Sequence, residues 1–212
     1  MSFVEKFRPY VQACAGCHRP TRSGVPYCSS CCFQVQAAGA LRWVQLQEHF
    51  GAYHWWPYFS EQALFRQLID VFKGHPPASF YRITDPFGAQ LYRRLGRHDL
   101  RLLPLPSSSG RQHAWALAKD LGGQVGWPVS DVFGRPGRSQ KYKSLFKRQQ
   151  LKLQLREGLP KAGGYVLVDD MVTTGATMMA ARRCLLDLGV DSRQIYATTL
   201  FYRPKGGSLN GF

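Results

Sequence analysis

Acidic residues and long apolar runs are the two features that this sequence has little of. Its 212 residues include 13 Asp and Glu against 28 Lys and Arg, which gives a formal net charge of +15 at pH 7. No segment approaches the roughly 18 consecutive apolar residues that a membrane-spanning helix needs, so we expect no membrane span. A composition of 44% hydrophobic and 19% charged residues also excludes a disordered tail. The excess of positive charge predicts anionic partners such as nucleic acid, phosphorylated metabolites or lipid surfaces.

Cysteine is scarce except in one short segment, where five of the six cysteines lie between positions 14 and 32. Two Cys-x-x-Cys pairs, Cys14 with Cys17 and Cys28 with Cys31, have the spacing of two knuckles that supply four sulfur ligands to Zn²⁺. An iron–sulfur cluster or disulfides are the alternatives. The charged opening residues, Met1 to Arg8, do not resemble a secretory signal and predict a cytoplasmic protein, which disfavours disulfides.

A site closed by four cysteines leaves no open position for water, so we expect structural zinc without catalysis. The metal would fold residues 1–40, which lack the apolar mass for a core of their own, as a separate module ahead of a domain spanning 41–212. His18 is interpreted as an exposed polar residue, Cys32 as a spare thiol and Cys184 as a small buried residue of a later helix.

Beyond position 40 the sequence alternates between strand and helix patterns, which predicts an α/β fold with a twisted, largely parallel sheet flanked by helices. Ligands of such sheets bind outside the carboxyl ends of the strands. We expect four helices. They are a helix from Ser60 to Gly74, one that starts at Asp85-Pro86, one over Ala114–Leu121 that Gly122-Gly123 ends, and one over Thr177–Leu188. We expect strands at Trp43–Leu46 and Tyr53–Phe59 around a turn near Gly51, and at Leu100–Leu105, Val129–Phe133, Leu151–Leu155, Tyr165–Val168 and Ile195–Phe201.

The most informative segment follows the Tyr165–Val168 strand, where Asp169 and Asp170 precede a loop of small hydroxyl residues and glycine that opens a helix. Backbone N–H groups at a helix start, a glycine and several hydroxyls suit a phosphate monoester. The carboxylates would repel a phosphate and instead fit sugar hydroxyls or a bridging Mg²⁺. A capped helix beside two solvated acids is the alternative. The loop residues are Thr173, Thr174, Gly175, Ala176 and Thr177.

Over Val166 to Met178 the sequence resembles the signature of type I phosphoribosyltransferases, which bind phosphoribosyl pyrophosphate (PRPP). The resemblance implies that Asp169 and Asp170 hold the ribose 2- and 3-hydroxyls. It also implies that residues 173–177 wrap the 5-phosphate and that Mg²⁺ accompanies the ligand.

The whole chain resembles the ComF/GntX competence-related branch of that superfamily, in which a four-cysteine zinc module precedes the phosphoribosyltransferase domain. Leu68–Gly74, Leu103–Pro106 and the Arg138–Arg148 region are similar to segments of this branch. The branch carries a basic segment after its Pro-x-Pro strand, whereas this chain has a shorter one with a single arginine. The resemblance implies that pyrophosphate is bound by Ser108, Ser109, Gly110, Arg111 and Lys73.

Basic residues crowd between Arg135 and Arg156, where no acidic residue occurs. Such a segment binds a nucleic-acid backbone, closes over pyrophosphate as a mobile loop, or forms a solvated surface. The candidate nucleic-acid residues are Arg135, Arg138, Lys141, Lys143, Lys147 and Arg148. The aromatic run Trp55, Trp56, Tyr58 and Phe59 is interpreted as a strand packed on the cysteine module rather than as a base-stacking platform.

Three functions are compatible with these features. The first is a ComF-like protein of natural transformation that binds PRPP, or a related ribose phosphate, and single-stranded DNA during DNA uptake, together with competence-machinery proteins. The second is a phosphoribosyltransferase of nucleotide salvage that joins a base to PRPP. The third is a regulator that senses PRPP without chemistry. No catalytic residue is identified in any of them.

Overall fold

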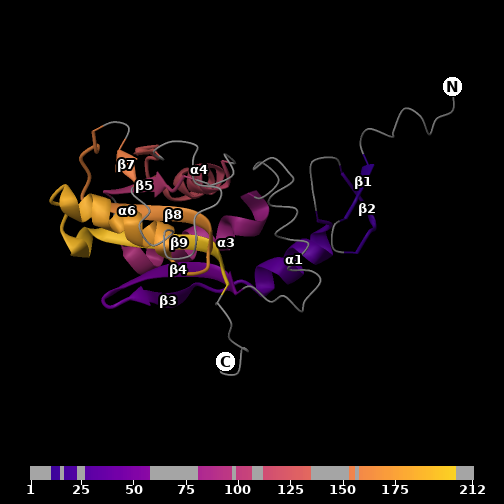
Figure 1. Ribbon diagram of the computed structural model, residues 1–212. Coiled ribbons are helices and arrows are strands. Elements are labelled where there is room, and N and C mark those ends of the chain that lie inside the picture. Colours follow the sequence, from indigo (N-terminus) through magenta and orange to yellow (C-terminus); the bar gives the residue numbers. More distant parts are fainter. Residues whose placement is uncertain are drawn as a thin grey trace, which may run out of the picture.

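The computed structural model of the chain describes residues 11–14, 17–22, 27–57, 81–96, 99–106, 112–134, 153–155 and 158–203 (Figure 1). The helices among them are α1 (Ser29–Ala37), α3 (Tyr81–Leu95), α4 (His113–Val125), α6 (Ala176–Asp187) and the 3-10 turn η3 (Ser192–Gln194). The strands are β1 (Val11–Ala13), β2 (Pro20–Arg22), β3 (Arg42–Gln47), β4 (Phe50–Pro57), β5 (Leu100–Pro104), β6 (Phe133–Gly134), β7 (Gln154–Leu155), β8 (Gly164–Val172) and β9 (Ile195–Tyr202). None of the helices in these described ranges combines the length and apolar character needed to cross a bilayer.

A five-stranded sheet with the order β3-β4-β9-β8-β5 forms the centre of the molecule. β4, β9, β8 and β5 run parallel, and β3 is an antiparallel edge strand. The expected mostly parallel α/β sheet flanked by helices is therefore confirmed.

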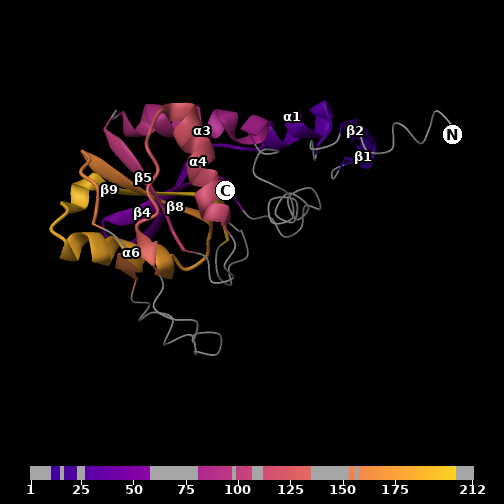
Figure 2. The same cartoon turned by 90° about the horizontal axis from the view of Figure 1, so that it is seen from above.

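Helices cover both faces of this sheet (Figure 2). On one face, Leu91 of α3 and Leu117 of α4 pack with Leu102 and Val166 of the sheet. On the other face, Met178 of α6 packs with strand residues of the opposite parity, which include Leu103 and Leu167. The alternation of side chains along each strand thus separates the core into two layers, one on each side of the sheet.

The β3–β4 hairpin turns earlier than expected. Gly51 lies within β4, and the turn falls at Glu48 and His49, where His49 adopts a φ of 57°. A Cβ on Gly51 would lie 2.2 Å from the Val44 carbonyl oxygen and 2.5 Å from the Trp43 ring. The glycine therefore permits close packing across the hairpin, and the expected turn near Gly51 was wrong by two to three residues.

Two helix boundaries also differ from expectation. α3 begins at Tyr81, so Pro86 is inside the helix rather than at its first position. α4 continues through Gly122 and Gly123 to Val125 and is capped by Gly126, whose φ is 76°. Gly122 is buried, and a Cβ there would lie 2.7 Å from the Trp127 carbonyl oxygen, so close packing explains this glycine.

Three strands have different lengths from those expected. β8 extends through Val172, because its ladder with β9 continues to the Met171–Phe201 and Val172–Tyr202 pairs. Val129–Phe133 forms only a bridge from Val129 to Leu102 and the start of β6. In the Leu151–Leu155 segment, the described strand is the two-residue β7. The expected helix from Ser60 to Gly74 lies outside the described residues.

Candidate functional site

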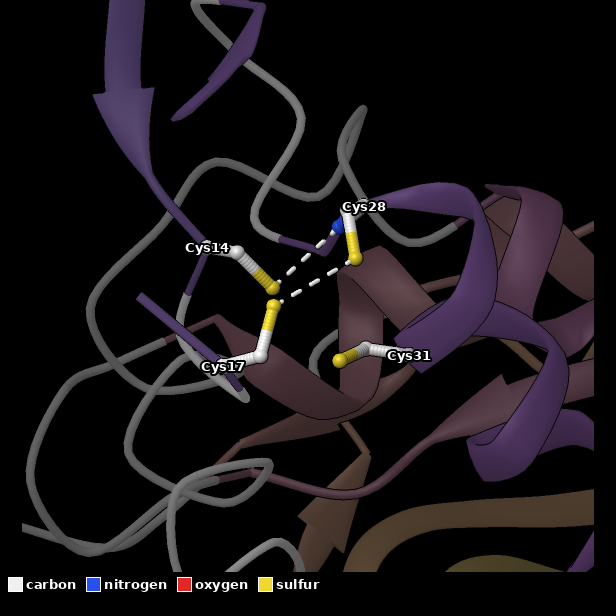
Figure 3. A group of neighbouring side chains, drawn as sticks. All are labelled: Cys14, Cys17, Cys28 and Cys31. Atoms are coloured by element: carbon white, nitrogen blue, oxygen red, sulfur yellow. Dashed lines mark hydrogen bonds between the residues drawn. The ribbon is translucent and has the colours of Figure 1, made fainter. Parts of the chain in front are cut away.

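Four cysteine side chains converge beside the start of α1 (Figure 3). Cys14 follows β1, Cys17 lies in the next turn, Cys28 is the N-cap of α1, and Cys31 is in the first turn of that helix. All four sulfur atoms lie within 4.8 Å of one another. The Cys17 and Cys28 sulfurs are 3.6 Å apart, and the Cys28 backbone N–H donates to the Cys14 sulfur over 3.3 Å. The expected cluster is therefore confirmed, and it is positioned to bind a metal ion.

The geometry of this cluster fits a tetrahedral ion of the size of zinc. With zinc–sulfur bonds of about 2.3 Å, tetrahedral ligands lie about 3.8 Å from each other, whereas disulfide sulfurs lie about 2 Å apart. No disulfide joins the four described cysteines, and the Cys17–Cys28 sulfur distance of 3.6 Å matches the wider spacing. Burial raises the pKa of the Cys31 thiol, and hydrogen bonding with the neighbouring cysteines raises it further. A divalent cation offsets this effect because it stabilises the deprotonated ligands.

The cysteine cluster is packed against the sheet. Cys14 and Cys31 share one hydrophobic core with Trp55 and Trp56 of β4, which are 1% and 0% exposed. The Trp56 indole N–H donates to the Val35 carbonyl oxygen of α1 over 3.0 Å. The interpretation of this part of the aromatic run as a strand packed on the cysteine module is confirmed, whereas Tyr58 and Phe59 lie outside the described residues.

The two acids of the predicted sugar site lie at the carboxyl end of β8. Both are half-buried strand residues, and Asp169 is in register with Thr199 of β9. A carboxylate oxygen of Asp169 accepts the Asp170 backbone N–H over 2.9 Å, and one of Asp170 accepts the Met171 N–H over 2.9 Å. These bonds orient each carboxylate along the strand. The acids precede the turn by two residues instead of forming part of it.

The turn between β8 and α6 consists of Thr173, Thr174 and Gly175. The two threonines are exposed, and Gly175 is the buried N-cap of α6 with a φ of 71°. Within the described ranges, the backbone N–H groups of residues 173–178 donate no hydrogen bond. A helix start leaves such groups available for an anion. Ala176 and Thr177 open the helix as expected.

The connections around β8 change face at this end of the sheet. β5 and β8 are adjacent and parallel; β5 is followed by α4 on one face, and β8 is followed by α6 on the other. Ligands of open α/β sheets bind in the crevice at such a switch point. The predicted pyrophosphate residues 108–111 follow β5 in sequence, but they and Lys73 lie outside the described residues.

A polar row that no sequence pattern predicts crosses the sheet toward Asp169. The strand registers align Arg42 with His54, His54 with Thr199, and Thr199 with Asp169, so these side chains share one face. His54 is 5% exposed, and its Nδ1 has no partner among the described residues. Burial and, to a smaller extent, the charge of Arg42 together lower the pKa of His54 to about 4. Only the strand order, which the sequence does not state, brings these residues together.

The predicted nucleic-acid residues between Arg135 and Arg148 lie outside the described part of the chain. The residues that flank them are described: Gly134 of β6 pairs with Gln154 of β7 in an antiparallel register. Gly134 and Gln154, one on each side of these residues in the sequence, therefore lie side by side.

Comparison with known proteins adds no assignment. No model of a known protein family matches the chain, and no curated protein matches it.

Proposed function

We propose that the chain binds PRPP, or a related ribose 5-phosphate ester, at the carboxyl end of β8. The observation that carries this proposal is the combination of unbonded amides at residues 173–178 with the carboxylates of Asp169 and Asp170, which are separated from those amides by two residues. The amides suit the 5-phosphate, and the carboxylates suit the ribose hydroxyls or a Mg²⁺ ion. Their position at the face-changing connection of the sheet supports the same location.

The wider proposal is a ComF-like role in natural transformation, in which the protein handles incoming single-stranded DNA. The four-cysteine cluster ahead of the α/β sheet and the net charge of +15 support it. In this proposal the metal is structural zinc held by Cys14, Cys17, Cys28 and Cys31. The cluster is saturated by its four protein ligands, so zinc would hold α1 against β4 and take no part in ligand chemistry.

Calorimetric titration with PRPP and Mg²⁺ tests the ribose phosphate site. We expect the double variant Asp169→Asn with Asp170→Asn to weaken binding at least about tenfold, because each lost carboxylate removes charge-assisted hydrogen bonds. The matched control, Asp99→Asn with Asp187→Asn, removes two exposed acids and the same charge elsewhere, and we expect it to bind like the wild type. Undiminished binding by the first variant contradicts the ribose assignment, and no binding by the wild type contradicts the proposal as a whole.

The same preparation separates binding from catalysis. Release of pyrophosphate from PRPP in the presence of one purine or pyrimidine base, and not of the others, would establish a phosphoribosyltransferase of nucleotide salvage. Binding without release, with reciprocal coupling between PRPP and single-stranded DNA, would establish a sensor.

A further inference from the structure

An exposed tryptophan lies on the edge strand of the sheet, away from the cysteine cluster. Trp43 of β3 is 52% exposed, whereas Trp55 and Trp56 on the neighbouring strand β4 are buried. Its indole faces Tyr53 of β4, its direct cross-strand partner, with ring centroids 4.8 Å apart in an edge-on arrangement. An indole exposed to this extent presents a flat apolar face on which a planar ligand can stack.

The Trp43 ring is held in place by its surroundings. It lies against the backbone of Gly51, where a Cβ would approach two of its ring atoms to 2.5 and 2.6 Å. The edge contact with Tyr53 fixes it from a second direction. A ring that is already ordered loses little conformational freedom when a flat group stacks on it, which favours binding.

A cation from a neighbouring helix completes the arrangement. Arg94, in the last turn of α3, donates from Nε to the Tyr53 hydroxyl over 3.1 Å, and its guanidinium lies 5.9 Å from the centre of the Tyr53 ring. Its two terminal nitrogens have no hydrogen-bond partner within the described ranges. Those nitrogens form the fork that binds a phosphate in a bidentate manner.

We infer that Trp43, Tyr53 and Arg94 form a stacking surface for single-stranded DNA, with a base on the Trp43 indole and a backbone phosphate on Arg94. An aromatic ring beside a guanidinium is the combination with which proteins bind single strands without sequence preference. The net charge of +15 supplies the complementary long-range attraction. Gln45 and Gln47, exposed on the same strand, add amide groups that reach base edges.

This inference rests on the proposed single-stranded DNA function and locates part of the binding surface. It differs from the sequence-based expectation, in which the candidate DNA residues lay between Arg135 and Arg148 and a stacking platform was weighed for the aromatic run that begins at Trp55. The structure buries Trp55 and Trp56 and leaves Trp43 exposed.

Fluorescence anisotropy with a labelled 20-nucleotide oligothymidine, titrated at several salt concentrations, tests the surface. We expect Trp43→Ala to weaken binding about 5- to 150-fold, the loss that corresponds to one stacked base, and Trp43→Phe to retain most of the affinity. We expect Arg94→Gln to reduce the slope of log affinity against log salt by about 0.7, the value for one phosphate contact on a single strand. The matched control is Phe33→Ala, which removes a 70% exposed ring from α1 and should bind like the wild type.

Photo-crosslinking to an oligonucleotide that carries 5-bromouracil gives a readout independent of any variant's folding. We expect the crosslinked peptide to contain Trp43 or Tyr53. Equal affinity of Trp43→Ala and Phe33→Ala, with crosslinks elsewhere, overturns the surface while leaving DNA binding intact. A wild type that does not bind the oligonucleotide overturns both the surface and the DNA role, and the PRPP titration then decides separately on the ribose phosphate site. A surface that instead binds another protein would show no DNA crosslink at Trp43 and equally overturns the inference.

Discussion

The buried histidine on β4 makes stability sensitive to mild acid. His54 is 5% exposed, its ring centroid lies 5.3 Å from that of Tyr202, and Arg42 faces it from β3. Burial and then the Arg42 charge hold the pKa of His54 at about 4 in the folded protein. The same side chain in the unfolded chain has a pKa of about 6.5. Acidification therefore protonates this residue in the unfolded chain before it does so in the folded protein.

The sign and size of the effect follow from this difference. The neutral imidazole contributes its full stability above pH 6.5, and that contribution is lost as the pH falls toward 4, because the unfolded chain binds the proton more readily. Linkage between the two pKa values gives a loss of about 2 kcal/mol at pH 5 and on the order of 3 kcal/mol at pH 4. A loss of that size is a substantial fraction of the stability of an ordinary domain.

Urea unfolding followed by circular dichroism between pH 7.5 and 4.5 measures this loss. We expect His54→Gln, which keeps a polar side chain that does not titrate, to flatten the decline by about 2 kcal/mol at pH 5. The matched control is His49→Gln, because the His49 side chain is 88% exposed, and it should decline like the wild type. Acid effects on the cysteine cluster are common to all three proteins and cancel in the differences. A His54→Gln variant with the wild-type pH dependence would refute the reasoning.

Three further predictions concern the helices and the cysteine cluster. Burial raises the pKa of Asp120, which accepts a hydrogen bond from Thr84 and also lies near the charge of Asp85. The stabilising contribution of its protonated form is therefore present at low pH and lost as the pH rises through that pKa. In urea titrations, we expect the free energy of unfolding of Asp120→Asn to exceed that of the wild type by on the order of 1 kcal/mol at pH 8 and to equal it near pH 4. Elemental analysis should find about one zinc per chain. Replacing the exposed Cys17 (Cys17→Ser) should lower both the zinc content and the near-ultraviolet circular dichroism of the tryptophans packed beside the cluster. A wild type that loses its metal with no change in this dichroism contradicts a structural ion. Gly126→Ala should cost about 1 kcal/mol because the φ of Gly126 is 76°, whereas Gly123→Ala, inside the same helix with open space around it, should stabilise by about 0.5–1 kcal/mol in the same assay.

Features encoded over a short stretch of chain could be predicted from the sequence. The spacing of Cys14, Cys17, Cys28 and Cys31 predicted the cluster correctly, because a Cys-x-x-Cys pair brings its own two sulfurs together and only one further contact is needed. The strand–turn–helix order around residues 164–187 was equally local, and only the length of the strand differed. β8 is longer than its apolar stretch because β9 provides hydrogen-bonding partners beyond the end of that stretch. The identities of Asp169 and Asp170 do not indicate that these partners exist.

Glycine and proline misled the sequence interpretation where packing overrides local preference. Gly122 and Gly123 indicate a helix end, yet α4 continues through them because its buried face packs against β5 and β8. Pro86 indicates a helix start, yet α3 begins a turn earlier, where Thr84 is buried and hydrogen-bonded to Asp120 of α4. In both helices the contact between two elements decides a boundary that single-residue propensities place elsewhere.

The order of the strands in the sheet determines which tryptophan is exposed to solvent and which polar residues lie next to each other. β4 is an inner strand packed against α3 and α1, so Trp55 and Trp56 are buried. β3 is the edge strand of the sheet, so Trp43 is half exposed. Hydropathy assigns the same value to all three. The same order places His54 two strands from Asp169, in a row that no sequence spacing suggests. The proposed phosphate site could therefore be found from the contiguous residues of one turn. The proposed stacking surface on the β3–β4 hairpin requires the fold, because its members come from two strands and a helix that are neighbours only in three dimensions.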